Sequence, residues 1–588
     1  MKYILSYTNP FLQYIDVEFI ITNVNSEKLE IQLPAWRPGR YELGNFAKNI
    51  QKWSAYDQNG NKLIHQKIKK DLWEIQTNGA STIHILYNYY AAELNAGSTW
   101  LDEHQLYVNP INCLLFVPER MNEVCVLELI IPKDYVVASG MKPLLGNDDS
   151  NKMIDNHFKI ERFETSNFHE LADSPFIASA ALEKDTYTCH GNTFHIWFQG
   201  LRNPSWKKIF HDFERFTKEQ FKIFGSFPFT EYHFLFHILP YKAYHGVEHQ
   251  NNTVITLGPT HSVMHGELYQ ELLGVSCHEL FHAWNIKAIR PVEMYPYNYT
   301  KENYSRLGYV AEGVTTYYGD LLLYRSGVFN DKAYFETFNV QLQKHFDNFG
   351  RFNLSVAESS FDTWLDGYNP GVPNRKVSIY TEGCLLAFIT DVLIRKETED
   401  QKSLDDVMHV LYLQYAQKQK GYTEQDYLNV VESVAGISFA DFFKTYFYGT
   451  DSLETLLSEG LEYLGLEMKK KPALKYYESN IGFKIIEDQG KKIVKNVFPQ
   501  SPAYSAGLML NDQIIAVNGI KVNGDLHEWC SYFSTNKDEP LVLTISTSSR
   551  MRDITISFSD EVFYQIYELA RLEVTSDNQK KAFESWAN

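Results

Sequence analysis

Two histidines and a glutamate lie within five residues of one another, and their types and spacing suit the binding of a metal ion. They are His278, Glu279 and His282, in the order HExxH. Residues four positions apart share a face of an α-helix, so both imidazoles can point at one ion. The carboxylate beside the first histidine can then reach a water molecule on that ion. The spacing predicts a hydrolytic site with one Zn²⁺ per chain, in which Glu279 is the general base toward that water.

The residues around the motif fit a helix. Apolar residues recur at helical spacing before it, at Leu268, Leu272 and Val275, and no proline occurs from 264 to 289. Pro291 then ends the helical pattern. The alternative is a buried helix whose two histidines are satisfied by backbone carbonyls, and the motif alone leaves that reading open.

A catalytic zinc ion usually takes three protein ligands and keeps a fourth position for water, so a third residue is needed. A metzincin would place glycine and histidine three and six residues after the second ligand, where this chain has Asn285 and Ala288. That class is excluded. The other common solution is a glutamate from a following helix, and Glu312 stands at the start of an apolar run that reaches Leu323. We predict that Glu312 is the third ligand, and a solvated surface carboxylate is the alternative.

Other stretches of the chain carry a family resemblance. They are HELFHAWN at 278–285 followed by Arg290-Pro291, AEG at 311–313 with the pair Tyr317-Tyr318, GVEH at 246–249, and LPAWRPGRY at 33–41. Together they resemble the glycyl aminopeptidases, gluzincin zinc metallopeptidases with a PDZ domain after the catalytic domain. GVEH is similar to the GxMEN segment of aminopeptidase N. The resemblance implies an α+β multidomain fold with an N-terminal β-sandwich, a thermolysin-like, mostly helical catalytic domain and a C-terminal PDZ domain.

The resemblance also implies an activity and the residues that serve it. The enzyme would be a zinc-dependent aminopeptidase that removes small residues, glycine or alanine, from peptides with a free N-terminus. Glu248 would bind the α-ammonium of the substrate, on a substrate-binding segment with Gly246 and Val247. Tyr380 matches the tyrosine that donates a hydrogen bond to the developing oxyanion. Because the chain contains 39 tyrosines, a packing role is the alternative for Tyr380.

Two positions depart from the family pattern. His245 stands where the first residue of a glycine pair is expected, and Glu382 stands where a lysine often occurs. Neither is a predicted metal ligand. They leave the shape of the substrate pocket, and so the preferred side chain, open.

The pattern along the chain indicates four parts. β-rich runs alternate with turn-like clusters up to about residue 170, and helical patterns dominate from about 205 to 450. The charged stretch 467–472 ends in proline and is typical of a linker or a domain boundary. We therefore predict a β-rich domain at 1–170, a gluzincin catalytic domain at 171–466, a PDZ domain at 472–560 and a helical tail at 561–588.

The third part resembles a PDZ fold through three stretches. They are IGFKI at 481–485, VFPQSPA at 497–503 and DQIIAVNG at 512–519. PDZ domains add an extended peptide to a sheet edge and hold its C-terminal carboxylate with backbone N–H groups of a glycine-containing loop. Ile481, Gly482 and Phe483 would form that loop, which implies a peptide C-terminus as a partner. A purely structural appendage is the alternative.

Composition limits the partners and the compartment. The 55 basic and 73 acidic residues give a net charge of −18, which argues against nucleic acid or an anionic membrane as the principal partner. The six cysteines include no CxxC pair, which favours free buried thiols over a disulfide framework. The apolar run at the start is too short for a signal peptide, and no later segment is long enough to span a bilayer. We expect a cytoplasmic location.

Two other functions stay open at this point. A thermolysin-type endopeptidase usually has an aspartate four residues after the third ligand, where this chain has Thr316. A PDZ peptide-binding scaffold with an inactive peptidase core is the other candidate, and the intact Glu279 argues against it. The sequence gives neither the physiological substrate nor the oligomeric state.

Overall fold

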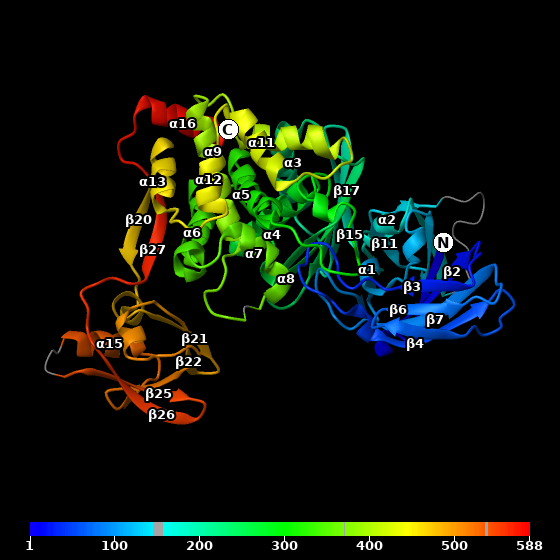
Figure 1. Cartoon of the computed structure of the whole chain (residues 1–588), viewed down its shortest axis with the longest axis horizontal. Coiled ribbons are helices and arrows are strands. Elements are labelled where there is room, and N and C mark those ends of the chain that lie inside the picture. The colour runs from blue at the N-terminus through cyan, green and yellow to red at the C-terminus, as the bar shows by residue number, and fades with distance from the viewer. Residues whose placement is uncertain (145–156, 370, 536–538) are drawn as a thin grey trace. The chain divides into compact units, whose positions relative to one another are not determined.

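The structure is a computed structural model that describes residues 1–144, 157–369, 371–535 and 539–588 (Figure 1). The chain divides into two units. Unit 1 consists of Met1–Tyr334, Phe349–Gly460 and Lys581–Asn588, and unit 2 consists of Phe335–Asn348 and Leu461–Lys580. All the residues predicted for the metal and the substrate lie in unit 1, and the predicted PDZ loop lies in unit 2.

The N-terminal part of unit 1 is β-rich, as predicted. Its strands follow a period of two: in β2 (Tyr14–Thr22), Ile15, Val17, Phe19 and Ile21 are buried and the residues between them are more exposed. The largest sheet has the order β12 (Lys142–Pro143), β13 (Phe158–Thr165), β10 (Cys125–Pro132), β1 (Lys2–Ser6), β2, β7 (Thr82–Tyr90), β4 (Ile50–Asp57). Two smaller sheets have the orders β11 (Val136–Ser139), β14 (Phe176–Ser179), β9 (Gln105–Val108), β8 (Trp100–Leu101) and β3 (Lys28–Gln32), β6 (Leu72–Gln76), β5 (His65–Lys69).

Another sheet in unit 1, with five strands, supports the metal site. Its order is β15 (Glu183–Cys189), β16 (Asn192–Gln199), β17 (Glu231–Ile238), β19 (Asn252–Gly258), β18 (Ala243–Glu248). Strands β16, β17 and β19 are parallel, and β18 runs antiparallel to β19 at the edge. Helix α4 (Gly266–His282) contacts both β18 and β19. The sheet therefore brings the GVEH segment next to the HExxH helix.

The middle of the chain is helical, in agreement with the sequence pattern (Figure 1). Helix α3 (Trp206–Phe224) buries residues at spacings of three and four, and Gly225, with φ 76°, ends it by donating its N–H to the carbonyl of Phe221. The other longer helices here are α5 (Thr315–Arg325), α6 (Asp331–Asp347), which runs from unit 1 into unit 2, α9 (Ile379–Glu397), α10 (Leu404–Leu411), α11 (Glu424–Ala435) and α13 (Glu454–Tyr463). A π-helical turn, η6 (Tyr309–Val314), precedes α5.

Unit 2 contains the sheet of the predicted PDZ domain. The strands follow the order β21 (Phe483–Asp488), β22 (Lys491–Val497), β23 (Gln513–Val517), β25 (Leu541–Thr547), β26 (Arg550–Ile556), with β24 (Ile520–Lys521) paired to β23. Two helices, α14 (Pro502–Ser505) and α15 (Leu526–Thr535), belong to the same part. Strand β21 is at the end of this order.

Two local predictions in unit 2 are wrong. The stretch 467–472, expected to be a linker, lies in strand β20 (Leu466–Pro472), and the first part of the tail predicted as helical at 561–588 contains strand β27 (Gln565–Arg571). The two strands pair antiparallel over seven residues. Residues of β27 such as Glu568, Leu569 and Ala570 favour helix locally, but the ladder with β20 outweighs that preference. The helix of the tail is α16 (Asp577–Ala587).

Two global expectations concern the whole chain. All six cysteines are buried and free, as predicted. No helix within the described ranges is both long and apolar enough to cross a membrane. The predicted cytoplasmic location and the predicted domain boundaries stay predictions.

Candidate metal centre

The two histidines of the HExxH motif converge on one point at the end of α4. The rings of His278 and His282 lie 4.7 Å apart between centroids and are nearly perpendicular, at 86°. Their Nε2 atoms are 3.1 Å apart. His282 is almost completely buried, whereas the side chain of His278 is 20% exposed. The helix therefore presents two imidazole nitrogens to a single position at the edge of a buried region.

Glu312 completes this group from η6. Its Oε2 lies 3.4 Å from Nε2 of His282 and 4.0 Å from Nε2 of His278. Two ligands of a tetrahedral zinc ion, each about 2.05 Å from it, would lie about 3.3 Å apart. Two of the three separations, 3.1 and 3.4 Å, are close to that value, and the third, 4.0 Å, is longer, so the residues present fit a zinc ion after a small movement of the His278 or Glu312 side chain.

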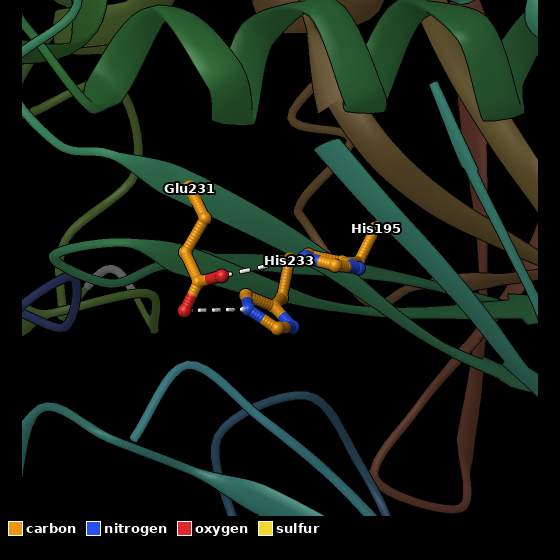
Figure 2. Close-up of side chains that lie close together, drawn as sticks. All are labelled: His195, Glu231 and His233. Carbon is orange, nitrogen blue, oxygen red and sulfur yellow. Dashed lines mark ion pairs between the residues drawn. The ribbon is translucent and has the colours of Figure 1, made fainter. Parts of the chain in front are cut away.

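A second histidine–carboxylate cluster in unit 1 fits a metal less well. Figure 2 shows Glu231 with ion pairs to His195 and His233, at 3.4 and 3.7 Å. The two rings are stacked at 4.4 Å and only 24° apart, so their in-plane lone pairs run side by side and do not converge. Trp197 Nε1 donates to Nδ1 of His233 at 3.2 Å, which leaves the proton of neutral His233 on Nε2, the nitrogen that faces Glu231. Only the first cluster combines convergent nitrogens with a carboxylate.

Backbone contacts orient the second histidine. Nδ1 of His282 lies 2.8 Å from the carbonyl oxygen of Asn285, so Nδ1–H donates and Nε2 keeps its lone pair for a metal. The side-chain amide of Asn285 in turn donates to the carbonyl of Val310 at 2.8 Å. Asn285 thereby ties the end of α4 to the turn that carries Glu312.

Charge in the site is set by burial and by Glu312. Burial lowers the pKa of His278 to about 3, so this imidazole is neutral and able to bind a cation. Burial acts in the same direction on His282, but the bonded carboxylate of Glu312 outweighs it and raises the pKa of His282 to about 10.

Glu279 lies beside this group. It is 5% exposed, and its Oε2 has no hydrogen-bond partner among the described residues. A Cβ atom on Gly246 of β18 would lie 2.2 Å from Glu279 Oε1, so a larger residue there would displace the Glu279 carboxylate. Burial is the largest cause that raises the pKa of Glu279 to about 8, and the carboxylates of Glu248 and Glu312 raise it further. The free oxygen is placed for a water molecule or a substrate.

Glu248 lies on the same side of β18, two residues after Gly246. Glu248, Glu279 and His282 each bring one ligand atom within 4.8 Å of the others. Gly39, with φ 78°, packs against the Glu248 carboxylate, where a Cβ would lie 2.5 Å from Oε2. The N-terminal domain therefore forms one wall around this carboxylate.

Val247 points the other way. Its side chain belongs to a hydrophobic cluster with Trp197, Leu235 and Val254, and its carbonyl accepts a hydrogen bond from Thr253 Oγ1 at 2.9 Å. The structure thus brings Gly246 and Glu248 to the site but not the side chain of Val247. Only the backbone of Val247 remains as a candidate for substrate contact.

Tyr380 lies near the start of α9. Its pKa is raised, first by burial and then by the nearby carboxylate of Glu312, so its hydroxyl keeps its proton and can donate. A Cβ on Gly313 would lie 2.4 Å from Cα of Gly383, so η6 and α9 pack backbone to backbone. That close packing places Tyr380 in the neighbourhood of Glu312.

Family models match the parts that build this site. The model of the peptidase M61 N-terminal domain matches residues 2–180, and the model of the M61 glycyl aminopeptidase matches residues 271–386, which includes His278, Glu279, His282 and Glu312. The chain belongs to the M61 glycyl aminopeptidase family. It is an aminopeptidase of this family, as predicted, and a PDZ domain model matches residues 493–546.

One solved structure agrees with the fold of this M61 peptidase over its whole length. An aminopeptidase N family protein from Idiomarina loihiensis is 26% identical, with a TM-score of 0.88 and 100% of both chains covered. An M1 zinc metallopeptidase from Deinococcus radiodurans is 12% identical, with a TM-score of 0.46, and the match covers 77% of this chain and 94% of that one. The second similarity is too low to bear on the site. A comparison with curated proteins found no match.

One contact to the metal centre of the M61 peptidase was missed from the sequence. Tyr41 of the N-terminal domain donates its hydroxyl to Glu312 Oε1 at 2.9 Å. The two residues are 271 positions apart, so no local spacing indicates the contact. The LPAWRPGRY stretch, which ends on Tyr41, was the one sequence feature that pointed to this residue, and it was used only for the family resemblance.

The residues predicted to form the PDZ carboxylate loop lie in unit 2, at the start of β21. Ile481 ends a π-helical turn, η10 (Tyr477–Ile481), Gly482 has φ 87°, and Phe483 begins the strand. The N–H of Gly482 donates to the carbonyl of Tyr477 at 2.9 Å. A peptide carboxylate at this loop would have to replace that hydrogen bond.

Proposed function

We propose that this chain is a zinc-dependent aminopeptidase that hydrolyses the first peptide bond of peptides with a free N-terminus. His278, His282 and Glu312 would hold one zinc ion, Glu279 would act as general base, and Glu248 would bind the substrate ammonium. The observation that carries the proposal is the position of Glu248 and Glu279 beside the same histidine, His282.

The balance of charge around this position supports the proposal. Three buried carboxylates, Glu248, Glu279 and Glu312, lie around two imidazoles. Buried carboxylates repel one another and are costly without cations. A divalent ion at the three-ligand group and an α-ammonium at Glu248 would together supply the missing positive charge. An endopeptidase substrate has no ammonium at the scissile end and would bring no cation to Glu248.

The roles of the residues follow from their chemistry. A bound zinc ion would polarise the scissile carbonyl and lower the pKa of a water molecule. Glu279, whose Oε2 is free, would take a proton from that water and pass it to the leaving amine nitrogen. Tyr380 would donate a hydrogen bond to the oxyanion. One water is consumed, the C–N bond breaks, and an amino acid and a shortened peptide are released.

The preferred residue and the partners are part of the proposal. The name of the family supports small N-terminal residues, glycine or alanine, as substrates. The PDZ match supports a peptide partner for unit 2, with Ile481 to Phe483 as the carboxylate loop, but the Gly482 N–H is already bonded to Tyr477. We therefore expect free-N-terminus peptides to be the main ligands and C-terminal peptides to bind weakly.

The ammonium-binding role of Glu248 is directly testable. Glu248→Gln should lower kcat/KM on free peptides by roughly 10- to 150-fold, the value of a hydrogen bond to a charged group, and leave the trace activity on N-acetylated peptides unchanged. Glu128→Gln is a matched control, because Glu128 is a buried carboxylate that pairs with Lys2 and Arg162 in the N-terminal domain. An equal loss on free and acetylated peptides would rule out this role.

A further inference from the structure

A buried guanidinium near the site has no carboxylate partner. Arg37 is 3% exposed, and no carboxylate oxygen of the described residues lies within 4.0 Å of it. Its only hydrogen bond among those residues is a long one, 3.3 Å, to the carbonyl of Pro38. An arginine stays charged in proteins, and an unpaired buried charge is costly. A buried charge that has no ion pair in the free enzyme commonly pairs with an oppositely charged group of a ligand.

The guanidinium lies on the wall of a cavity. The cavity has a volume of about 450 Å³, within the range of small-molecule sites, and its lining includes Arg37, Arg40, Gly97, Ser98, Thr99 and Asn112. A Cβ on Gly97 would lie 2.2 Å from Nη2 of Arg37, so glycine leaves the space that the guanidinium uses. Oδ1 of Asn112 is also buried without a hydrogen-bond partner in the described part of the chain. Within the described residues, this wall therefore carries one unsatisfied buried oxygen and one guanidinium that lacks an ion pair.

The neighbouring arginine behaves differently. Arg40 forms an ion pair with Glu42, and its guanidinium also lies over the ring of Tyr368, 5.8 Å from the centroid. Its charge is thus compensated within the protein. Arg37 is the arginine of this wall that still lacks an anion.

Arg37 is also close to the proposed ammonium site. Gly39 packs against the carboxylate of Glu248. Arg37 precedes Gly39 by two residues, so the Cα atoms of Arg37 and Gly39 are at most about 7.6 Å apart. The charges of Arg37 and Glu248 affect each other, and Arg37 also affects the pKa of Glu279. A peptide spans about 3.3–3.6 Å per residue. A peptide of two or three residues with its ammonium at Glu248 could therefore reach Arg37 with its carboxylate.

We propose that Arg37 binds the α-carboxylate of a short peptide substrate, so that dipeptides and tripeptides with a free C-terminus are the preferred substrate class. This inference rests on the proposed aminopeptidase function. Glu248 and Arg37 then fix the two ends of the substrate, and the distance between them selects its length. The planar guanidinium can make two parallel hydrogen bonds to a carboxylate, which a C-terminal amide cannot accept in the same way.

The test compares alanyl dipeptides and tripeptides with their C-terminal amides and with peptides of five and eight residues. The wild type should prefer the short free acids over their amides by roughly 10- to 100-fold in kcat/KM. Arg37→Gln should remove this preference by lowering activity on the acids while changing activity on the amides less than about threefold. Arg40→Gln is the matched control, because its charge is already paired, and it should keep the preference.

The outcomes separate this inference from the proposed function. Equal wild-type activity on acids and amides would overturn the inference while leaving an aminopeptidase, and so would an equal loss on both substrates in Arg37→Gln. If no peptide of any length or C-terminus is cleaved, both proposals fall. If Arg37→Gln does not fold, the wild-type ratio decides alone, and Arg37→Lys should retain only part of the preference.

Discussion

At the scale of single residues, the site depends on hydrogen bonds that reach the metal ligands from outside the HExxH motif. Nδ1 of His282 is held by the carbonyl of Asn285, and Oε1 of Glu312 is held by the hydroxyl of Tyr41. Partners of this kind fix the orientation of a ligand and tune its affinity for metal. The Tyr41 contact makes the N-terminal domain part of the metal centre.

The first prediction concerns this hydroxyl. Tyr41→Phe should lower zinc affinity by roughly 10- to 100-fold, because Glu312 loses the donor that orients it. The measurement is zinc retention against a chelator series. Tyr87→Phe is the matched control, since the Tyr87 hydroxyl is also buried but donates to the backbone of Cys113 at 2.8 Å. Equal zinc retention in the two variants would contradict the role of Tyr41.

At the scale of elements, the site is set by how the continuous segment of η6 and α5 packs between α4 and α9. Gly319 of α5 lies against His278, where a Cβ would be 3.3 Å from the histidine Cβ, and Gly313 of η6 lies against Gly383 of α9. Because glycine has no side chain, the helical segments can approach closely at these positions. The π-helical turn therefore holds Glu312 at the distance that the histidines require.

The second prediction follows from that packing. Gly313→Ala would place a methyl group 2.4 Å from Cα of Gly383 and should separate η6 from α9, at a cost of about 1–3 kcal/mol and with weaker zinc binding. Gly274→Ala is the control within α4, because the nearest atom to its Cβ would be 3.9 Å away. It should be neutral or stabilising by roughly 0.5–1 kcal/mol. Thermal unfolding and zinc content check both variants, and an unchanged Gly313→Ala protein would refute this account of the packing.

The sequence was sufficient to predict those features of the fold and the site that depend on residues close together in the chain. The HExxH helix follows from periodicity and motif spacing, whereas Glu248 and Tyr380 were predicted from the family resemblance. The structure places Glu248 beside Glu279 and His282, and Tyr380 in the neighbourhood of Glu312. Strand β27 was missed because Glu568, Leu569 and Ala570 favour helix until β20 pairs with them. Tyr41 and Arg37 were missed because their contacts form only when two distant parts of the chain pack together.

At the scale of the whole molecule, the end of the chain returns to the catalytic unit. Lys581–Asn588 belong to unit 1, and Trp586 is 1% exposed. Its Nε1 donates to the hydroxyl of Tyr317 at 2.8 Å, and that hydroxyl donates to Asp391 at 2.7 Å. Tyr317 lies on α5, the helix that continues from Glu312. The tail therefore supports the helix behind the third ligand.

The third prediction tests this support. Trp586→Ala should destabilise unit 1 by about 3–5 kcal/mol, because it removes a large buried side chain and its hydrogen bond. The unfolding transition of unit 1 should fall by several degrees in calorimetry. Val574→Ala, at an 86% exposed position of the same tail, should leave the transition in place. If both variants unfold at the wild-type temperature, the tail does not stabilise the catalytic unit.

The most direct test of the central claim is product mapping by mass spectrometry on a peptide library of which half is N-acetylated, with zinc measured on the same sample. We predict one zinc per chain and stepwise loss of N-terminal residues from the free peptides only. Glu279→Gln should keep the zinc and lose roughly 10²–10⁴-fold in turnover, because it removes the general base but no metal ligand. Internal cleavage, or cleavage of acetylated peptides at the same rate, would contradict the aminopeptidase, and absence of both zinc and cleavage would indicate a binding scaffold instead.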